Sequence, residues 1–190
     1  MSDDTVAYQP EETGHDPIIE EINAEAFGPG RFARAAYKIR EGGPHDRTLS
    51  FVALCDGEVV GSVRQSWVDA GGARALLLGP LAVRPDWKNR GIGRQLVRIA
   101  VDAARQAGAP AVILVGDAPY YGPLGFSRVP FGQIRMPRPV DPARLLIAEI
   151  KPGALSALSG ELVHADRALL RQQGKLPSLA VPHGSKGQQQ

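Results

Sequence analysis

The sequence predicts an α/β (α+β) fold in which a mixed sheet carries helices on both faces. Three observations support this fold class. Two apolar runs flank the turn signal Asp56-Gly57, which is typical of an antiparallel hairpin. Residues 91–107 repeat apolar side chains at helical spacing. The short apolar strand Ala111–Val115 follows that helix, so the strands on either side of it are expected to run parallel.

The N-terminal half is predicted to hold a short strand, two helices and three longer strands. Thr5–Tyr8 is the first strand, and Asp16–Phe27 is a helix because Asp16 can cap it and Pro17 suits its first position. A second helix is expected over Arg31–Arg40, with Phe32, Ala36 and Ile39 on one face. The three strands are expected over Leu49–Cys55, Glu58–Trp67 and Arg74–Val83.

The last of these strands contains Gly79-Pro80. Proline cannot donate a ladder hydrogen bond, so inside a strand it indicates a bulge or an unpaired edge. We therefore expect free backbone groups at this position.

The C-terminal half is predicted from weaker signals. Tyr120–Phe126 is a short turn or helix, strands follow near Ser127–Met136 and Leu145–Ile150, and a helix is expected over Gly160–Gln173. We expect a single domain over residues 1–173, with its core at about 5–150 and an extension over 151–173. Residues 174–190 are expected to form a flexible tail.

Composition limits the classes of function. The 43% hydrophobic and 22% charged residues are typical of a globular protein, no apolar run is long enough to cross a membrane, and no signal peptide is visible. We therefore predict a cytoplasmic protein without a membrane partner. A lone cysteine, Cys55, excludes an internal disulfide.

The charges are distributed unevenly along the chain. The first 30 residues carry eight acids and no Lys or Arg, so the remainder has a net charge of +10. A basic body suits nucleic acid or a phosphate-rich small ligand. No Arg-rich recognition helix is visible, so we predict no nucleic-acid partner. The acids of the first helix suggest a cationic substrate.

The segment before the long helix is a candidate anion site. The first N–H groups of a helix lack intrahelical partners, and Gly91 and Gly93 let a phosphate approach the backbone. Lys88, Arg90 and Arg94 add positive charge. The alternative is a plain strand-to-helix turn that the glycines merely ease. A dinucleotide fingerprint fails because Leu96 replaces its third small residue, and no Walker A ending is present.

Residues Leu81 to Leu96 resemble the acetyl-CoA-binding motif of the GNAT superfamily, and Tyr121-Gly-Pro-Leu-Gly-Phe126 resembles its second signature. The resemblance implies a largely antiparallel sheet with a central splayed parallel strand pair. It also implies acetyl-CoA as cosubstrate. The cofactor-binding residues it implies are Leu81, Ala82, Val83, Lys88, Asn89, Arg90, Gly91, Ile92, Gly93, Arg94 and Tyr121.

One position departs from the family motif. Lys88 stands where Arg or Gln is usual; it keeps the charge but loses the planar fork, so a looser phosphate contact is expected there.

The resemblance also implies direct attack of an amine acceptor on the thioester. Tyr121 is the implied general acid, with Tyr120 as its rival, and Asp117 is our candidate base ahead of Glu25. Ser66 and Trp67 are candidates for lining the acceptor cleft. No metal is predicted, because the histidines show no metal-binding spacing. A non-catalytic acyl-CoA sensor or scaffold is the alternative function, and a homodimer is the default oligomer.

Overall fold

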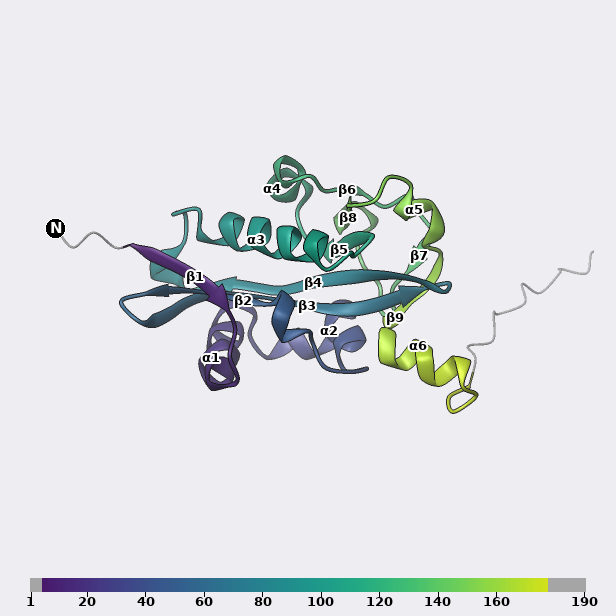
Figure 1. Cartoon of the computed structure of the whole chain (residues 1–190), viewed down its shortest axis with the longest axis horizontal. Helices are drawn as coiled ribbons and strands as arrows, with labels where there is room; N and C mark the ends of the chain where they lie inside the picture. Colours follow the sequence, from purple (N-terminus) through teal and green to yellow (C-terminus); the bar gives the residue numbers. More distant parts are fainter. Residues whose placement is uncertain (1–4, 178–190) are drawn as a thin grey trace, which may run out of the picture.

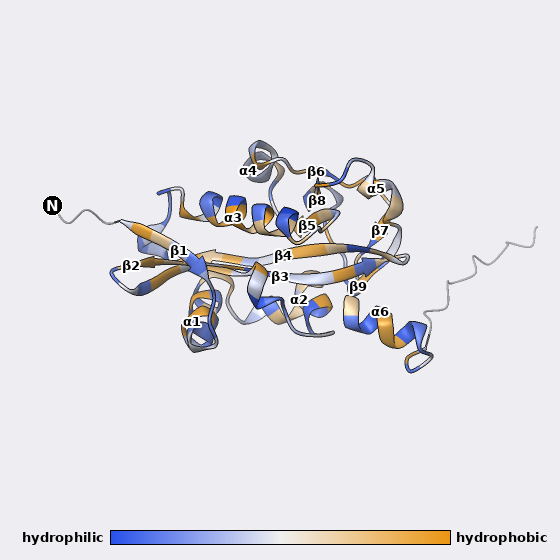
Figure 2. Ribbon diagram, viewed as in Figure 1, coloured by the Kyte–Doolittle hydropathy of each residue, from blue (hydrophilic) through white to orange (hydrophobic). Residues whose placement is uncertain are grey.

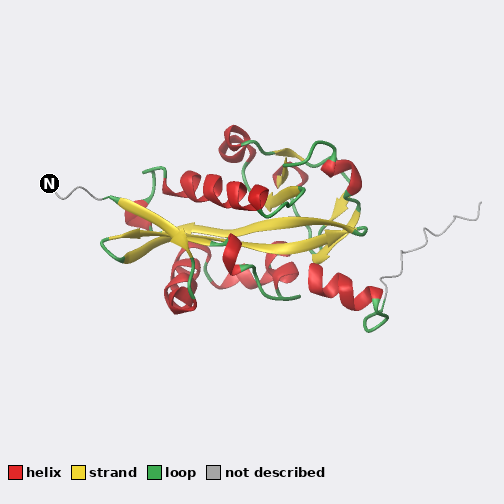
Figure 3. Ribbon diagram, in the orientation of Figure 1, coloured by secondary structure: helices red, strands yellow, loops and turns green. Residues whose placement is uncertain are grey.

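The structure is a computed structural model, and it describes residues 5–177. Part of the predicted tail, residues 178–190, therefore lies outside the described residues. Helices cover both faces of the sheet: α3 (Ile92–Gln106) and α4 (Ala118–Tyr121) lie on one side, and α1 (Asp16–Phe27), α2 (Ala35–Arg40) and α6 (Ala165–Gln172) lie on the other (Figures 1 and 3). The predicted fold class is confirmed.

Seven of the nine strands in the described chain lie side by side in one linear order. Its order is β1-β2-β3-β4-β5-β8-β6, with β9 pairing to β3 and β7. These strands are β1 (Val6–Pro10), β2 (Phe51–Cys55), β3 (Glu58–Ala70), β4 (Ala73–Val83), β5 (Ala111–Val115), β6 (Ser127–Arg128), β7 (Ile134–Arg135), β8 (Leu145–Glu149) and β9 (Gly160–His164). The hairpin at Asp56-Gly57 and the parallel β4–β5 pair are confirmed.

Strands β4 and β5 separate after two residue pairs. The last parallel partners are Leu77 and Ile113, although β4 continues to Val83. On its other side, β4 pairs with β3 through a bulge: Val63 stands opposite Leu81 and Gln65 opposite Leu78. Gly79 and Pro80, joined by a cis peptide, therefore face Arg64 alone. The predicted bulge and the splayed pair are both present.

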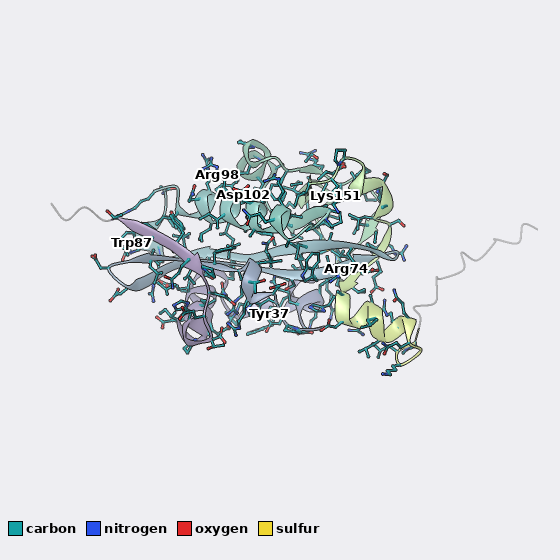
Figure 4. The ribbon with its side chains drawn as sticks, in the orientation of Figure 1. Tyr37, Arg74, Trp87, Arg98, Asp102 and Lys151 are labelled. Atoms are coloured by element: carbon teal, nitrogen blue, oxygen red, sulfur yellow. The ribbon has the colours of Figure 1, made fainter. Side chains whose placement is uncertain are left out.

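Helix α3 buries one face against the sheet. Ile92, Leu96, Val97 and Ala100 are at most 2% exposed, and they pack with apolar residues of β2, β3 and β4. Figure 2 shows the hydrophilic residues of this helix on its outer side, where Figure 4 places Arg98 and Asp102. The helix begins at Ile92 because Gly91 adopts a left-handed conformation, with a φ of 79°, which costs glycine little.

Two predictions of secondary structure were wrong, and a third was right only in part. Residues 31–40 form a 3-10 turn, Pro29–Ala33, and then α2, because Arg34 is extended. This break lets Ile39 be buried while Phe32 stays 42% exposed, so these residues share no face.

The other two lie in the C-terminal part. Residues 160–164 form β9 rather than the start of a helix, because Leu162 pairs with Ala70 at the end of β3 and is fully buried there. Residues 127–136 form the short strands β6 and β7, which a turn at Pro130–Gln133 separates. Among the described residues, no helix has the length and apolar character needed to cross a membrane.

Candidate active site

A cavity of about 1010 Å³ occupies the gap where β4 and β5 separate. The β4 bulge, from Leu78 to Leu81, lines one edge of the gap, and the end of β5, from Leu114 to Gly116, lines the other. Helix α4 contributes to the wall on one side of the sheet, and α1 and α2 contribute on the other. The cavity therefore connects the two faces of the sheet through the opening that the bulge and the splay create.

The start of α3 has the features of an anion site. No side chain caps this helix, and its first intrahelical bond runs from the Gln95 N–H to the Gly91 carbonyl. The N–H groups of Ile92, Gly93 and Arg94 come before that bond, so they keep no intrahelical partner. Arg94 and the preceding residues 88–91 are exposed. This end of the helix can therefore receive an anion from solvent.

The basic side chains around this helix start differ in position. Lys88 lines the cavity. Arg90 stacks over the Trp87 ring, 4.5 Å from its centroid, and Arg94 lies 5.5 Å from the centroid of Tyr120. Figure 4 shows Trp87 near the end of the molecule where β1 begins.

Tyr120 and Tyr121 reach different parts of the site. A Cβ added to Gly93 would lie 2.7 Å from the Tyr120 hydroxyl, so this phenol stands beside the start of α3. The Tyr121 ring occupies the space over Gly116, at the end of β5, and contacts Phe126 edge-on. Both residues line the cavity. Tyr120 therefore lies at the start of α3, and Tyr121 lies at the gap between β4 and β5.

The Tyr121 phenol stays protonated over the physiological range. Burial raises its pKa to about 12, and the charges of Tyr120 and Asp117 add to this rise while Arg144 opposes it. Burial also raises the pKa of Tyr120. A neutral phenol is a hydrogen-bond donor, as a general acid must be.

Asp117 lines the cavity and lies directly before α4. Its carboxylate is 3.3 Å from Nε of Arg144, and its side chain is 73% exposed. This placement allows contact with water as well as with a molecule in the cavity.

The α1–α2 side of the cavity is rich in cations. Arg31, Arg34, Arg40 and Arg64 all line it, and sequence reasoning identified none of them. Arg40, the last residue of α2, is half-buried and lines the cavity. Burial lowers the pKa of Arg40 to about 10, so its guanidinium remains charged at neutral pH.

An ion-pair network fixes this side of the cavity. The Glu11 carboxylate is fully buried and bonds to His45, to Nε of Arg64 at 2.9 Å and to Nη1 of Arg47 at 3.1 Å. Asp16 accepts from both arginines, at 2.6 Å and 2.7 Å. Burial alone would raise the pKa of Glu11, but hydrogen bonds from His45 and Arg64 outweigh it and hold the pKa below the ordinary value. The network joins β1, α1 and β3.

Two buried oxygens on this side have no hydrogen-bond partner within the described chain. They are Oδ1 of Asn23, on α1, and Oγ of Ser66, on β3, and both residues line the cavity. Buried polar atoms normally find partners, so unpartnered ones beside a cavity are candidates for ligand contacts.

The predicted site residues fall into three groups, which line the cavity, lie at or beyond the end of β4, or lie away from the cavity. Leu81, Lys88, Asp117, Tyr120, Tyr121 and Ser66 line the cavity. Ala82 and Val83 end β4, and Asn89 to Arg94 form the loop and helix start beyond it. Glu25 is exposed and lies 3.9 Å from Arg84, away from the cavity lining. Trp67 donates to Asp46 at 3.0 Å and is likewise not part of this wall.

A sheet opened at a bulge, a cavity through the opening and an uncapped helix start beside it are the features of an acyl-CoA N-acyltransferase. The sequence profile of the Acetyltransferase (GNAT) family matches residues 17–126. The chain belongs to this family.

Relatives and solved structures agree with that assignment. The uncharacterised N-acetyltransferase YhbS of Escherichia coli K12 is 30% identical over 147 residues, which is 76% of this chain and 87% of YhbS. The crystal structure of Escherichia coli YhbS in complex with CoA matches with a TM-score of 0.72 and 26% identity, covering 86% of this chain and 92% of that one. A GNAT family acetyltransferase from Brucella melitensis, in complex with acetyl-CoA, matches with a TM-score of 0.59 and 26% identity, covering 78% and 90%.

Proposed function

We propose that the protein transfers the acetyl group of acetyl-CoA directly to a primary amine, on a small molecule or a protein. The observation that carries this proposal is the cavity through the β4–β5 gap. It places a protonated tyrosine on one side of the sheet and a polar, cation-lined pocket on the other. The gap is the position at which two substrates, arriving from opposite sides, can meet.

The residues of the opening fit a CoA molecule. The uncapped start of α3 suits the pyrophosphate, with Lys88 and Arg94 supplying charge. The ends of β4 and β5, no longer paired to each other, offer backbone groups near Leu81 and Val83 to the amides of the pantetheine arm, as an added strand would do. Bound acetyl-CoA supplies the activated acetyl thioester.

The chemistry requires one bond to form and one to break. The neutral amine nitrogen attacks the thioester carbonyl, the C–N bond forms, the C–S bond breaks, and the nitrogen loses a proton. A backbone N–H near Leu81 stabilises the negative charge that develops on the carbonyl oxygen during the attack. Tyr121 donates a proton to the departing thiolate, and Asp117, directly or through water, accepts the proton from the amine.

The test is the release of free thiol from acetyl-CoA in the presence of a panel of amines. The proposal predicts turnover with at least one amine and formation of the matching N-acetyl product by mass spectrometry. Tight CoA binding without turnover for any amine would contradict it and favour the sensor or scaffold.

Asp117→Asn tests the base. It should slow turnover most at low pH, where less of the amine is neutral, while leaving CoA affinity unchanged. A pH–rate profile parallel to that of the wild type would remove Asp117 from this role.

A further inference from the structure

Three of the four acids of the cavity wall are paired with cations, whereas several of its cations have no acidic partner among the described residues. Glu20 pairs with Arg31 at 2.7 Å, Glu41 with Lys38 at 3.1 Å, and Asp117 with Arg144 at 3.3 Å. The fourth acid, Asp141, accepts the backbone N–H of Ala143. The unbalanced charge of the cavity is therefore positive.

Arg40 is the deepest of the cations without an acidic partner. It makes no hydrogen bond or ion pair with any residue in the described part of the chain; burial lowers its pKa, Tyr37 opposes that shift, and the like charge of Arg64 adds to it. A Cβ on Gly79 would lie 3.2 Å from Nη1 of Arg40, so the guanidinium stands against the β4 bulge. A buried charge without a partner is costly, which favours a partner supplied from outside the chain.

The surroundings of Arg40 point to a small anion with further polar contacts. Ser66 follows Arg64 by two residues on β3, so both side chains leave the strand on the same face. Its hydroxyl is buried and unpartnered, as is the amide oxygen of Asn23 on the α1 side of the same cavity. A hydroxyl can donate to a carboxylate, and an amide oxygen can accept from an amine.

We propose that the acceptor is an amino carboxylate, whose carboxylate binds Arg40 and Ser66 while its amine faces the β4–β5 gap. This inference rests on the proposed acetyl transfer and specifies its substrate class. A single deep guanidinium balances one negative charge, and its planar fork matches a carboxylate. The exposed cation Arg34 stacks on Phe27 at 5.3 Å and is not required.

This proposal differs from the expectation of a cationic substrate. The acids of α1 that suggested such a substrate have partners within the fold: Asp16 binds Arg47 and Arg64, and Glu20 binds Arg31. Glu21 and Glu25 lie near Arg84. Only Glu20 among these acids lines the cavity, and it is paired with Arg31, so they leave the surplus positive charge of the cavity in place.

The experiment compares matched acceptors. Thiol release is measured with glycine, leucine and glutamate, with their C-terminal amides, with the corresponding decarboxylated amines, and with O-phosphoethanolamine. We expect kcat/KM for free amino acids to exceed that for the amides by about 10- to 100-fold, the range of a charge-assisted hydrogen bond. Equal or faster turnover of the amides or the phosphorylated amine would overturn the carboxylate assignment while leaving the acetyl transfer intact.

Arg40→Met removes the charge and keeps much of the stem. The variant should lose the preference for carboxylates, Arg40→Lys should recover part of it, and the affinity for acetyl-CoA should not change. Because it removes an unpaired buried charge, Arg40→Met should also melt at least as high as the wild type. Arg167→Met, at an exposed site on α6, is the control for net charge. A lower melting temperature with an unchanged preference would indicate a structural role.

A binding measurement is independent of turnover. Calorimetry with N-acetylleucine and N-acetylglutamate on the CoA-bound protein should show binding that Arg40→Met abolishes. Equal binding to the wild type and the variant would overturn the inference even if the enzyme were active. Thiol release from no amine at all, combined with Arg40-dependent binding, would count against the proposed function alone.

Discussion

The two sides of the β4–β5 gap are built in different ways. On the α3 side, the candidate anion site comes from one continuous segment, residues 88–94, and depends on the chemistry of a helix start. On the α1–α2 side, the wall depends on contacts between residues far apart in sequence, such as Glu11 with Arg64, 53 positions away. In the proposed function, the first side binds the part that all acyl-CoA molecules share, and the more varied side chains of the second side distinguish one acceptor from another.

This contrast predicts that substitutions on the two sides will have different effects on CoA affinity and on stability. A change near α3 should reduce the affinity for CoA and leave the stability unchanged. A change in the ion-pair network should reduce the stability, because its residues tie the segment after β1 and the start of α1 to β3.

The largest effect is expected from Gly93→Glu. A Cβ here already meets the Tyr120 hydroxyl at 2.7 Å, and a carboxylate would face the phosphates at the helix start. We expect calorimetry to detect no CoA binding, with the melting temperature little changed. Gly14→Glu is the control, since no atom lies within 4 Å of a Cβ at that exposed site. Wild-type CoA affinity in Gly93→Glu would show that this loop is not the phosphate site.

The next effect is expected from Tyr121→Phe, at the gap itself. Loss of the proton donor should lower kcat by about 10²- to 10⁴-fold, the usual contribution of general acid catalysis. The acetyl-CoA affinity should stay close to that of the wild type. Tyr120→Phe is the matched control, because its hydroxyl lies beside Gly93, and it should retain most of the rate. If Tyr120→Phe is the slower variant, the two tyrosines exchange roles.

The secondary structure on the α3 side was predictable for a physical reason. A strand, a Gly-containing loop and a helix start are local features, so the end of β4, the turn at Gly91 and the start of α3 could be predicted from their spacing. The bulge was predictable because Pro80 cannot donate a ladder hydrogen bond.

The α1–α2 side gave no comparable signal in the sequence. Arg40 appears in the sequence as one of many basic residues, and only the packing of α2 against the bulge places it beside Gly79. Glu11 appears in the sequence as part of an acidic N-terminal stretch, and only the tertiary contacts with His45 and Arg64 bury it. Strand β9 was missed because its partner, the far end of β3, is about 90 residues away.

A smaller effect, on stability, is expected from Glu11→Gln. The change leaves Arg64 and His45 partly uncompensated in a buried site, which costs about 3 kcal/mol. Chemical denaturation should show the loss, while CoA affinity measured on the folded protein should not change. The exposed Glu12→Gln provides the matched control. A loss of CoA affinity equal to that in Gly93→Glu would contradict the separation of the two sides.

The same network should make the protein sensitive to acid. The pKa of Glu11 is lowered because hydrogen bonds from His45 and Arg64 outweigh burial, and that of Asp16 is lowered chiefly by the hydrogen bond from Arg47. Their stabilisation is complete above the ordinary values of 4.5 and 3.8 and is lost as the pH falls through the lower folded values. The urea concentration at the unfolding midpoint should therefore decrease once the pH drops below about 4, and this decrease should be less steep in Glu11→Gln. Parallel profiles for the two proteins would show that this carboxylate does not carry the acid sensitivity.

The smallest effect is expected on stability at high pH, and it depends on Tyr121. Burial raises the pKa of Tyr121 to about 12, above its ordinary value of 10.0. The folded protein then keeps a neutral phenol at a pH where the unfolded chain ionises, so this contribution to stability is complete below pH 10 and is lost as the pH rises toward 12. Phenolate absorbance should show a tyrosine that titrates late in the wild type and is missing in Tyr121→Phe. A phenol at position 121 that ionises near 10 would mean that solvent reaches the gap, and the ability of Tyr121 to stay protonated beside a departing thiolate would then need another source.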